Sequence, residues 1–320
     1  HSPALMLYYK FRKEVFFLLF EEIAFDVLSA ASQVANQLTD HYLLERRLKA
    51  ALGRPAIFHP NRWRNLTAGN GVPIHLFFPQ DVAPSGVLLF FHGGGWTSGG
   101  TESYARVCQV MAQITRRCVV SVDYRLAPEH PFPAGLDDCY SVTESFYTHP
   151  SRWGIRGQDI VLIGDSAGAN LCAAVTLRAR DTGDFLPTAQ ILLYPALWND
   201  YSENSPFPSL RENGQNYLLT ARRLQDYMSY YAPQEEKNNP YVAPLLCRDL
   251  SRQPPTLLFS AEHDPLRDEG ETYAAALRRA GNQVECFRVP NALHGYFSLS
   301  PRVPIVRMTY GRINRFLKNL

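Results

Sequence analysis

Residues 159–175, DIVLIGDSAGANLCAAV, constrain the fold of this chain more than any other stretch. A run of branched apolar residues stops at Gly164, Ser166 follows, and a helical pattern of small residues begins at once. A glycine stands two positions away on each side of the serine. Between a strand and a helix, this pattern is typical of a nucleophile elbow, which exposes the serine hydroxyl above a sheet. The other interpretation is a glycine-rich turn, so the rest of the chain must supply partners for Ser166.

Strand-like runs alternate with helical patterns along most of the chain after residue 62. Alternation of this kind predicts the α/β class, with a mostly parallel eight-stranded sheet flanked by helices. The first two runs have no helix between them, so we expect an antiparallel start. The strand-like runs are RWRNLTA, VPIHLFF, GVLLFFH, CVVSVDY, DIVLIGD, AQILLYP, PTLLFSA and VECFRVP; helical segments lie near 101–116, 134–148, 167–181 and 267–280, and RINRFLKN closes the chain.

Two helical regions fall outside this alternation. Residues 10–52 have a helical pattern that ends at Gly53 and Pro55, which are stop signals. After ILLYPALW the chain continues to about residue 239 without a strand and includes YLLTARRLQDYMSYYAP. We expect both regions to cover the C-terminal edge of the sheet as a helical cap. The predicted division is 1–52 for the N-terminal part of the cap, 198–240 for the cap insertion, and 53–197 with 241–320 for the core.

The bulk composition narrows the class of protein. The chain has 320 residues, of which 46% are hydrophobic and 19% charged, as in a globular protein with a large core. A formal net charge of +2 gives no reason to expect a nucleic-acid partner. The six cysteines show no CxxC spacing, so we expect reduced thiols, a cytoplasmic location, no metal site and no cofactor.

The apolar N-terminal stretch EVFFLLFEEIAFDVL is not expected to span a membrane. Acidic residues, Glu21, Glu22 and Asp26, interrupt it well before the about 18 uncharged residues of a transmembrane helix. No basic start leads to a small-residue cleavage site, so no signal peptide is evident. The stretch is either an amphipathic helix packed on the body or a lid helix that faces lipid.

A nucleophilic serine needs a base and a carboxylate that orients it, all at the C-terminal ends of strands. Asp264 in TLLFSAEHDPLRDEG directly follows a strand and is the best acid. His294 in VPNALHGYF follows the last strand and is the best base, with a surface loop histidine as the alternative. The order Ser, Asp, His is the one an α/β-hydrolase needs. The rivals are Glu262, His263 and Asp268, of which Asp268 is better explained as a first-turn charge of the following helix.

The stretch LLFFHGGGWTSGG supplies candidate donors for a developing oxyanion. We expect the N–H groups of Gly93, Gly94 and Ala167 to form an oxyanion hole, because glycines leave the peptide accessible. A flexible turn is the alternative. A phosphate loop is disfavoured because no Gly-Lys-Ser/Thr and no GxGxxG spacing follows. Trp96 either forms a wall of an acyl pocket or packs in the core.

Five motifs, HGGGW, DYRLAPEHPFPAGLDD, GDSAGAN, DPLRDEG and HGYF, occur in this order. Together they resemble the hormone-sensitive-lipase family of α/β-hydrolases, which includes bacterial carboxylesterases and acetyl esterases. The resemblance spans roughly residues 60–300, and NPYVAPL is similar to the family's return from its cap. The segment HYLLERR is similar to a stretch of bacterial acetyl esterases.

The resemblance implies an α/β-hydrolase fold with a helical cap and the hydrolysis of short-chain acyl esters through an acyl-enzyme. It implies Ser166 as nucleophile, Asp264 as acid and His294 as base, and the same oxyanion hole. Tyr296 stands where many members have Phe, which affects the shape of one pocket wall. The supporting residues are then His92, Gly95, Asp165, Arg125 and Glu129, with surface charge as the alternative for the last three, and the pocket residues are Trp96, Tyr194, Leu266 and Tyr296.

Other functions stay open at this point. The segment VFFLLF suggests an interfacial lipase on longer acyl chains. A non-catalytic ligand-binding protein of the same fold, like the plant gibberellin receptors that resemble this family, typically lacks the base, whereas His294 is present. A peptidase or amidase would use the same triad, but no peptide-selecting module is visible. The expected partner is a small-molecule ester, and a homodimer is compatible with the sequence.

Overall fold

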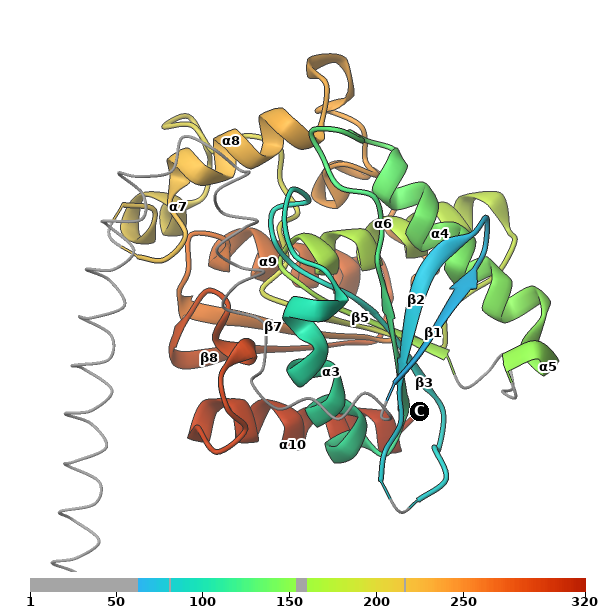
Figure 1. Cartoon of the computed structure of the whole chain (residues 1–320). Helices are drawn as coiled ribbons and strands as arrows, with labels where there is room; N and C mark the ends of the chain where they lie inside the picture. Colours follow the sequence, from blue (N-terminus) through green and yellow to red (C-terminus); the bar gives the residue numbers. More distant parts are fainter. Residues whose placement is uncertain (1–62, 81, 154–159, 216) are drawn as a thin grey trace, which may run out of the picture.

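The computed structural model describes residues 63–80, 82–153, 160–215 and 217–320. Within these ranges eight strands form one sheet with the order β1-β2-β4-β3-β5-β6-β7-β8 (Figure 1). The strands lie where the sequence predicted them, which confirms the α/β class and the eight-stranded sheet. They are β1 (Trp63–Ala68), β2 (Val72–Phe77), β3 (Val87–Phe91), β4 (Cys118–Val122), β5 (Ile160–Asp165), β6 (Ala189–Leu193), β7 (Thr256–His263) and β8 (Val284–Leu293).

Most neighbouring strands run parallel to one another. From β4 through β3, β5, β6 and β7 to β8, every pair in the sheet is parallel. β1 pairs with β2, and β2 with β4, in antiparallel register, which confirms the predicted antiparallel start. Because parallel strands end at the same edge of a sheet, the loops after β3, β5, β7 and β8 come together there.

Helices occupy the stretches between the parallel strands. The four predicted helical segments are confirmed, and the last helix begins earlier than RINRFLKN because Pro304 is well tolerated in a first helical turn. The helical elements are α3 (Thr101–Thr115), α4 (Ala134–Thr148), α5 (Pro150–Trp153), α6 (Ala167–Thr182), α7 (Pro208–Asn213), α8 (Ala221–Tyr231), η3 (Gln234–Glu236), η4 (Pro244–Leu246), α9 (Arg267–Arg279), η5 (Tyr296–Ser298) and α10 (Pro304–Lys318).

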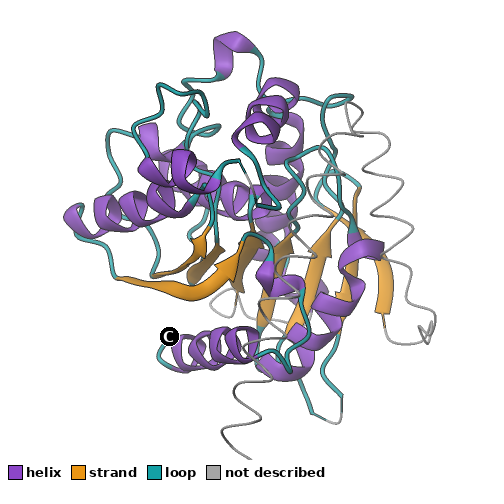
Figure 2. Cartoon of the chain, turned by 90° about the vertical axis from the view of Figure 1, so that its left-hand side faces the viewer, coloured by secondary structure: helices purple, strands orange, loops and turns teal. Residues whose placement is uncertain are grey.

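Helices cover both faces of the sheet (Figures 1 and 2). α3 and α10 share one core with Leu88 and Phe90 of β3, whereas α4, α6 and α9 share the other core with Leu89 and Phe91. Successive side chains of a strand point to opposite faces, so a continuous apolar strand supplies both cores. This explains why the central strands have uninterrupted apolar runs in the sequence.

The long segment between β6 and β7 contains α7, α8, η3 and η4. α7 and α8 lie at the top of the molecule in Figure 1, beyond the sheet and above α9. The Thr220 side chain accepts the Arg223 N–H and so caps the N-terminus of α8. The predicted N-terminal helix, 10–52, and the apolar stretch within it lie outside the described residues.

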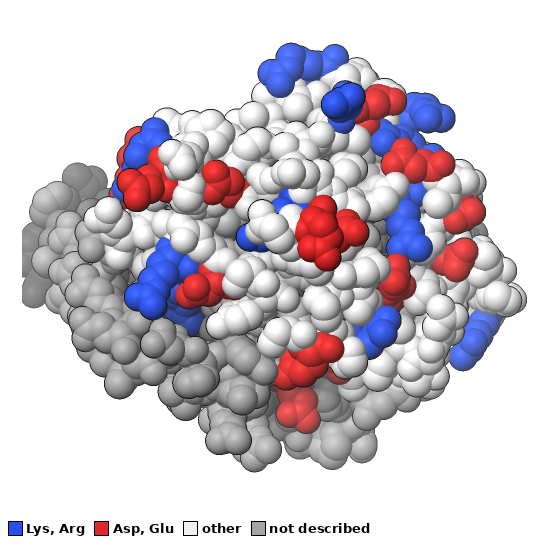
Figure 3. Space-filling model, turned by 90° about the horizontal axis from the view of Figure 1, so that it is seen from above, with Lys and Arg blue, Asp and Glu red and all other residues white. Residues whose placement is uncertain are grey.

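The surface of the described part is mixed in charge. On the face seen from above, acidic and basic groups are interspersed among uncharged ones (Figure 3). This distribution agrees with the small formal net charge of +2. Among the helices of the described ranges, none has both the length and the apolar character that a membrane span requires.

Candidate active site

Ser166 occupies the bend between β5 and α6. Its backbone has φ 53° and ψ −119°, a conformation that is costly for a residue with a side chain. Three backbone hydrogen bonds hold the bend: the Ser166 N–H donates to Leu193 O at 2.9 Å, and Ser166 O accepts the N–H groups of Asn170 at 3.1 Å and Ala196 at 3.4 Å. The surroundings therefore impose a strained turn on this serine.

The two glycines of the motif are required by close backbone contacts. A Cβ atom on Gly168 would overlap the carbonyl oxygen of Phe91, at the end of β3. A Cβ atom on Gly164 would overlap the carbonyl oxygen of Gly168 itself. The first turn of α6 thus lies directly against two strands, which only glycine permits.

The three side chains expected to form a triad lie in one hydrogen-bonded row. His294 Nε2 is 2.9 Å from Ser166 Oγ, and His294 Nδ1 is 2.8 Å from Asp264 Oδ2. Asp264 is fully buried, and its other oxygen accepts the Leu266 N–H at 2.9 Å. A carboxylate can only accept, so the proton lies on Nδ1 and Nε2 is left to accept the Ser166 hydroxyl proton. This is the arrangement that activates a serine nucleophile.

The rival residues are engaged elsewhere. Glu262 accepts the Asn291 N–H at 2.7 Å, and the His263 ring stacks on Tyr217 at 5.8 Å. Asp268 does lie in the first turn of α9, as the sequence indicated, but it also accepts the Ser209 N–H at 2.7 Å. Asp264 is therefore the acid that the structure places beside His294.

The glycine loop after β3 differs from the expectation at one position. The Gly93 N–H donates to Asp165 Oδ1 at 2.8 Å, so it is already used within the protein. Asp165 Oδ2 in turn accepts the Tyr104 hydroxyl at 2.9 Å. The prediction of Gly93 as an oxyanion donor is therefore corrected: this N–H anchors the loop to Asp165, the residue directly before Ser166.

Comparison with known proteins agrees with this geometry. A family model described as alpha/beta hydrolase fold, of the hormone-sensitive-lipase-like type, matches residues 88–298. The chain belongs to this family. This match confirms the resemblance that the five motifs indicated.

Two curated relatives and one solved structure show how far the similarity of this α/β-hydrolase extends. The carboxylesterase NlhH of Mycobacterium tuberculosis is 35% identical over 246 residues, which cover 75% of this chain and 76% of the relative. The ethyl acetate hydrolase of Pseudomonas putida is 30% identical over 236 residues, or 72% of this chain and 73% of that protein. The esterase of Pyrobaculum calidifontis has a TM-score of 0.80 at 31% identity and covers 91% of this chain and 97% of its own.

The other supporting residues of this α/β-hydrolase are packed or paired. His92 is buried, its ring stacks on Tyr124 at 4.4 Å, and its carbonyl oxygen accepts the Tyr124 hydroxyl at 2.6 Å. Arg125 forms a two-pronged ion pair with Asp138 of α4, at 2.9 Å from Nε and 2.8 Å from Nη2. Glu129 lies on the surface. These contacts of His92 and Arg125 stabilise the loops that follow β3 and β4.

The four expected pocket residues are all at least 97% buried. Trp96 stacks on Tyr231 of α8, with ring centroids 4.4 Å apart and planes at 5°, which favours the packing interpretation. Tyr194 lies edge-on to the His294 ring, with ring centroids 4.9 Å apart. Tyr296 donates or accepts a hydrogen bond with Thr309 at 3.0 Å, and Leu266 belongs to the core. A role in lining the substrate pocket stays a prediction for all four.

Sequence reasoning missed two buried residues that hold the ends of the insertion. Asn170 of α6 donates from Nδ2 to Ala196 O at 2.9 Å and to Val242 O at 2.8 Å, where the chain leaves and re-enters the core. Glu269 Oε1 accepts the Leu197 N–H at 2.6 Å and the Tyr201 hydroxyl at 3.2 Å. Burial raises the pKa of Glu269 to about 8. Asn170 lies in the motif GDSAGAN and Glu269 in DPLRDEG, but the hydrogen-bond partners of both residues are distant in sequence.

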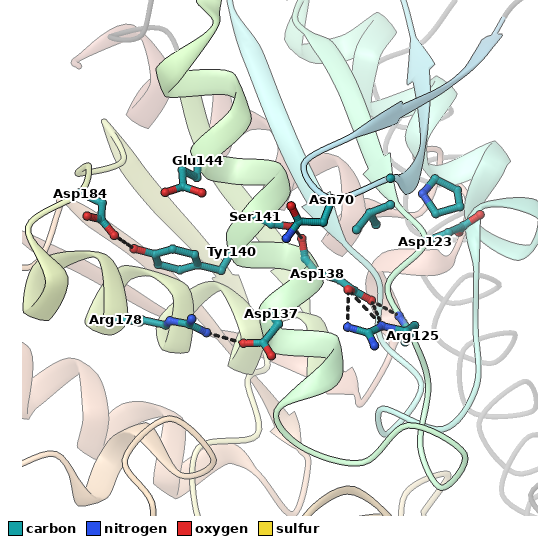
Figure 4. Close-up of a pocket in the computed structure, with 13 residues that line it drawn as sticks. Asn70, Asp123, Arg125, Asp137, Asp138, Tyr140, Ser141, Glu144, Arg178 and Asp184 are labelled. Atoms are coloured by element: carbon teal, nitrogen blue, oxygen red, sulfur yellow. Dashed lines mark hydrogen bonds and ion pairs between the residues drawn. The ribbon is translucent and has the colours of Figure 1, made fainter.

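A separate hollow of about 830 Å³ lies beside α4 and the β1–β2 turn (Figure 4). Its acidic and basic side chains largely pair with one another, as Arg125 does with Asp138 and Arg178 with Asp137. No member of the triad lines it. The hollow is therefore separate from the row formed by Ser166, His294 and Asp264.

Proposed function

We propose that the chain is a serine carboxylic ester hydrolase that works through an acyl-enzyme. Ser166 Oγ attacks the ester carbonyl carbon while His294 Nε2 takes the hydroxyl proton, and His294 then returns a proton to the leaving alcohol. Water, activated by the same histidine, releases the acyl group. The observation that carries this proposal is the row of contacts from Ser166 Oγ to His294 at 2.9 Å and on to Asp264 at 2.8 Å.

Carboxylic ester hydrolysis is also supported by the relatives, which are named as a carboxylesterase, an ethyl acetate hydrolase and an esterase. These names do not favour an interfacial lipase or a non-catalytic binding protein. A short-chain acyl preference is our proposal, because the resemblance implies it and one relative is named for an acetate ester.

For the oxyanion hole we propose the N–H groups of Gly94, Gly95 and Ala167. Within the described residues, none of these three N–H groups is assigned an acceptor, whereas Gly93 donates to Asp165. Ala167 is the first residue of α6, so its N–H has no partner within the helix. Donors of this kind typically contribute about 3 kcal/mol each to stabilising the tetrahedral intermediate.

The α7–α8 insertion, 198–240, also contacts this loop. The Tyr227 ring of α8 lies where a side chain on Gly95 would be, and Tyr231 stacks on Trp96. We therefore propose that 198–240 is the cap insertion over a core of 53–197 and 241–320, whereas the predicted N-terminal part of the cap, 1–52, lies outside the described residues. Cytoplasmic location and a homodimer stay predictions, which cell fractionation and sedimentation velocity test.

Hydrolysis of p-nitrophenyl esters from acetate to palmitate tests the function, with wild type compared with Ser166→Ala. We expect turnover of acyl chains of about two to six carbons, lost in the variant, while its circular dichroism spectrum is unchanged. The matched control is Ser205→Ala, because Ser205 is also a buried serine but lies outside the row of Ser166, His294 and Asp264. Asn170 is not used as a control, because its side chain holds the ends of the insertion. Serine-independent turnover, or a rate that rises only above the solubility limit of the substrate, would contradict the proposal.

A further inference from the structure

The turn that carries Asp264 is held by the insertion as well as by the core. Ser209 of α7 donates from Oγ to Pro265 O at 2.9 Å. Its own N–H donates to Asp268 Oδ2 at 2.7 Å, and the Asp268 N–H donates back to Ser209 Oγ at 3.1 Å. Ser209 is fully buried, so these bonds are shielded from competing water. One side chain thus connects both ends of the segment 265–268.

Further contacts from α7 reach the same turn. The Asn213 side chain donates from Nδ2 to Asp264 O at 3.4 Å, and it is 96% buried. Arg267 donates to Glu212 of α7 at 2.7 Å and to Glu262 O at 3.2 Å. α7 therefore contacts four residues of this turn, which are Asp264, Pro265, Arg267 and Asp268.

The position of this turn decides where the triad acid lies. Asp264 is the first residue after β7, and its carboxylate reaches His294 from one side while the Leu266 N–H holds it from the other. Misplacement of a catalytic group by about 1 Å can cost about a hundredfold in rate. A contact that fixes residues 264–268 therefore acts on the His294–Asp264 distance.

We propose that Ser209, together with Asp268, is a positioning pair for the triad, which fixes the turn that presents Asp264 to His294. This inference rests on the proposed ester hydrolysis. It assigns α7 a fixed place in the catalytic machinery, so that the insertion is mechanically coupled to proton transfer and not only a cover over the substrate.

Ser209→Ala tests the proposal in the full chain, with p-nitrophenyl acetate as substrate. We expect kcat to fall by about ten- to a hundredfold while KM changes by less than about threefold, because substrate contacts are retained. The matched control is Ser205→Ala, in the same segment: Ser205 is also buried, but its hydroxyl has no hydrogen-bond partner among the described residues. The control should keep kcat within about twofold of wild type.

A double-mutant cycle separates positioning from a general loss of structure. In an Asp264→Asn background the acid is already impaired, so adding Ser209→Ala should change the residual rate by less than about twofold. If Ser209→Ala does not fold, Asp268→Ala replaces it, and Asp268→Asn, which keeps an acceptor oxygen for the Ser209 N–H, should recover most of the rate.

Two results would overturn the positioning role. The first is a kcat of Ser209→Ala equal to that of wild type, and the second is a loss that multiplies in full with that of Asp264→Asn. Either leaves ester hydrolysis itself standing. If instead wild type shows no Ser166-dependent hydrolysis, the proposed function is wrong, and the positioning role that rests on it is wrong as well.

Discussion

Asp165 joins the glycine loop to the nucleophile elbow, and removing its carboxylate should reduce both stability and activity. The residue is 95% buried and directly precedes Ser166. One carboxylate oxygen accepts the Gly93 N–H at 2.8 Å, and the other accepts the Tyr104 hydroxyl at 2.9 Å. Burial and the neighbouring carboxylate raise the pKa of Tyr104 well above its usual value, so its hydroxyl keeps its proton to donate.

The two hydrogen bonds set the size of the effect. In Asp165→Ala the buried Gly93 N–H and the half-buried Tyr104 hydroxyl lose their acceptor, and an unsatisfied buried group costs about 1–3 kcal/mol, so we expect a loss of about 2–4 kcal/mol. In Asp165→Asn the remaining oxygen can accept the Gly93 N–H while the Tyr104 hydroxyl rotates to accept from the amide. We therefore expect a loss of only about 1 kcal/mol for Asp165→Asn.

Urea unfolding gives the stability of each variant, and p-nitrophenyl acetate hydrolysis gives kcat. The free energy of unfolding should fall in the order wild type, Asp165→Asn, Asp165→Ala, and kcat should fall most in Asp165→Ala because the loop that supplies Gly94 and Gly95 loses its anchor. Asp226→Ala, on the exposed side of α8, is the control and should stay within about 0.5 kcal/mol of wild type. If Asp165→Ala kept the stability and kcat of wild type, Gly93 would not need this anchor and the reasoning would be refuted.

Two further predictions concern stability. The pKa of Glu269 is about 8 in the folded chain, against 4.5 for an ordinary glutamate, so between these pH values the folded chain holds a proton that the unfolded chain releases, and stability falls as pH rises. Glutamine does not ionise, so in Glu269→Gln the urea midpoint should decline less between pH 5 and pH 8 than it does in wild type. An equal decline of the midpoint in both proteins would mean that Glu269 is ionised when folded. Gly311→Ala in α10, where a methyl group meets open space, should raise the free energy of unfolding by about 0.5–1 kcal/mol, and a lower urea midpoint would contradict this.

The sequence by itself determined the strands, the principal helices and the elbow, because each depends on neighbours within a few residues. Apolar runs, the Gly-x-Ser-x-Gly pattern and the strand that precedes it are local signals, and they predicted the bend at Ser166. The order of the chain also placed Asp264 and His294 after strands that end at the same edge of the sheet. That these residues lie at one edge of the sheet with Ser166 then followed from the topology of the α/β class.

Only the tertiary structure decided which polar groups are already used. Gly93 is 72 residues from Asp165 in the chain, and no local pattern shows that its N–H donates to that carboxylate. Ser209 and Asp268 are 59 residues apart, and Asp268 alone has the pattern of an ordinary first-turn charge. A hydrogen bond forms only when its donor and acceptor atoms lie about 3 Å apart, whereas a sequence pattern predicts helices and strands but not the distances between them. The sequence could therefore name the reacting groups, but the packing of α7 and the glycine loop determines what holds them in place.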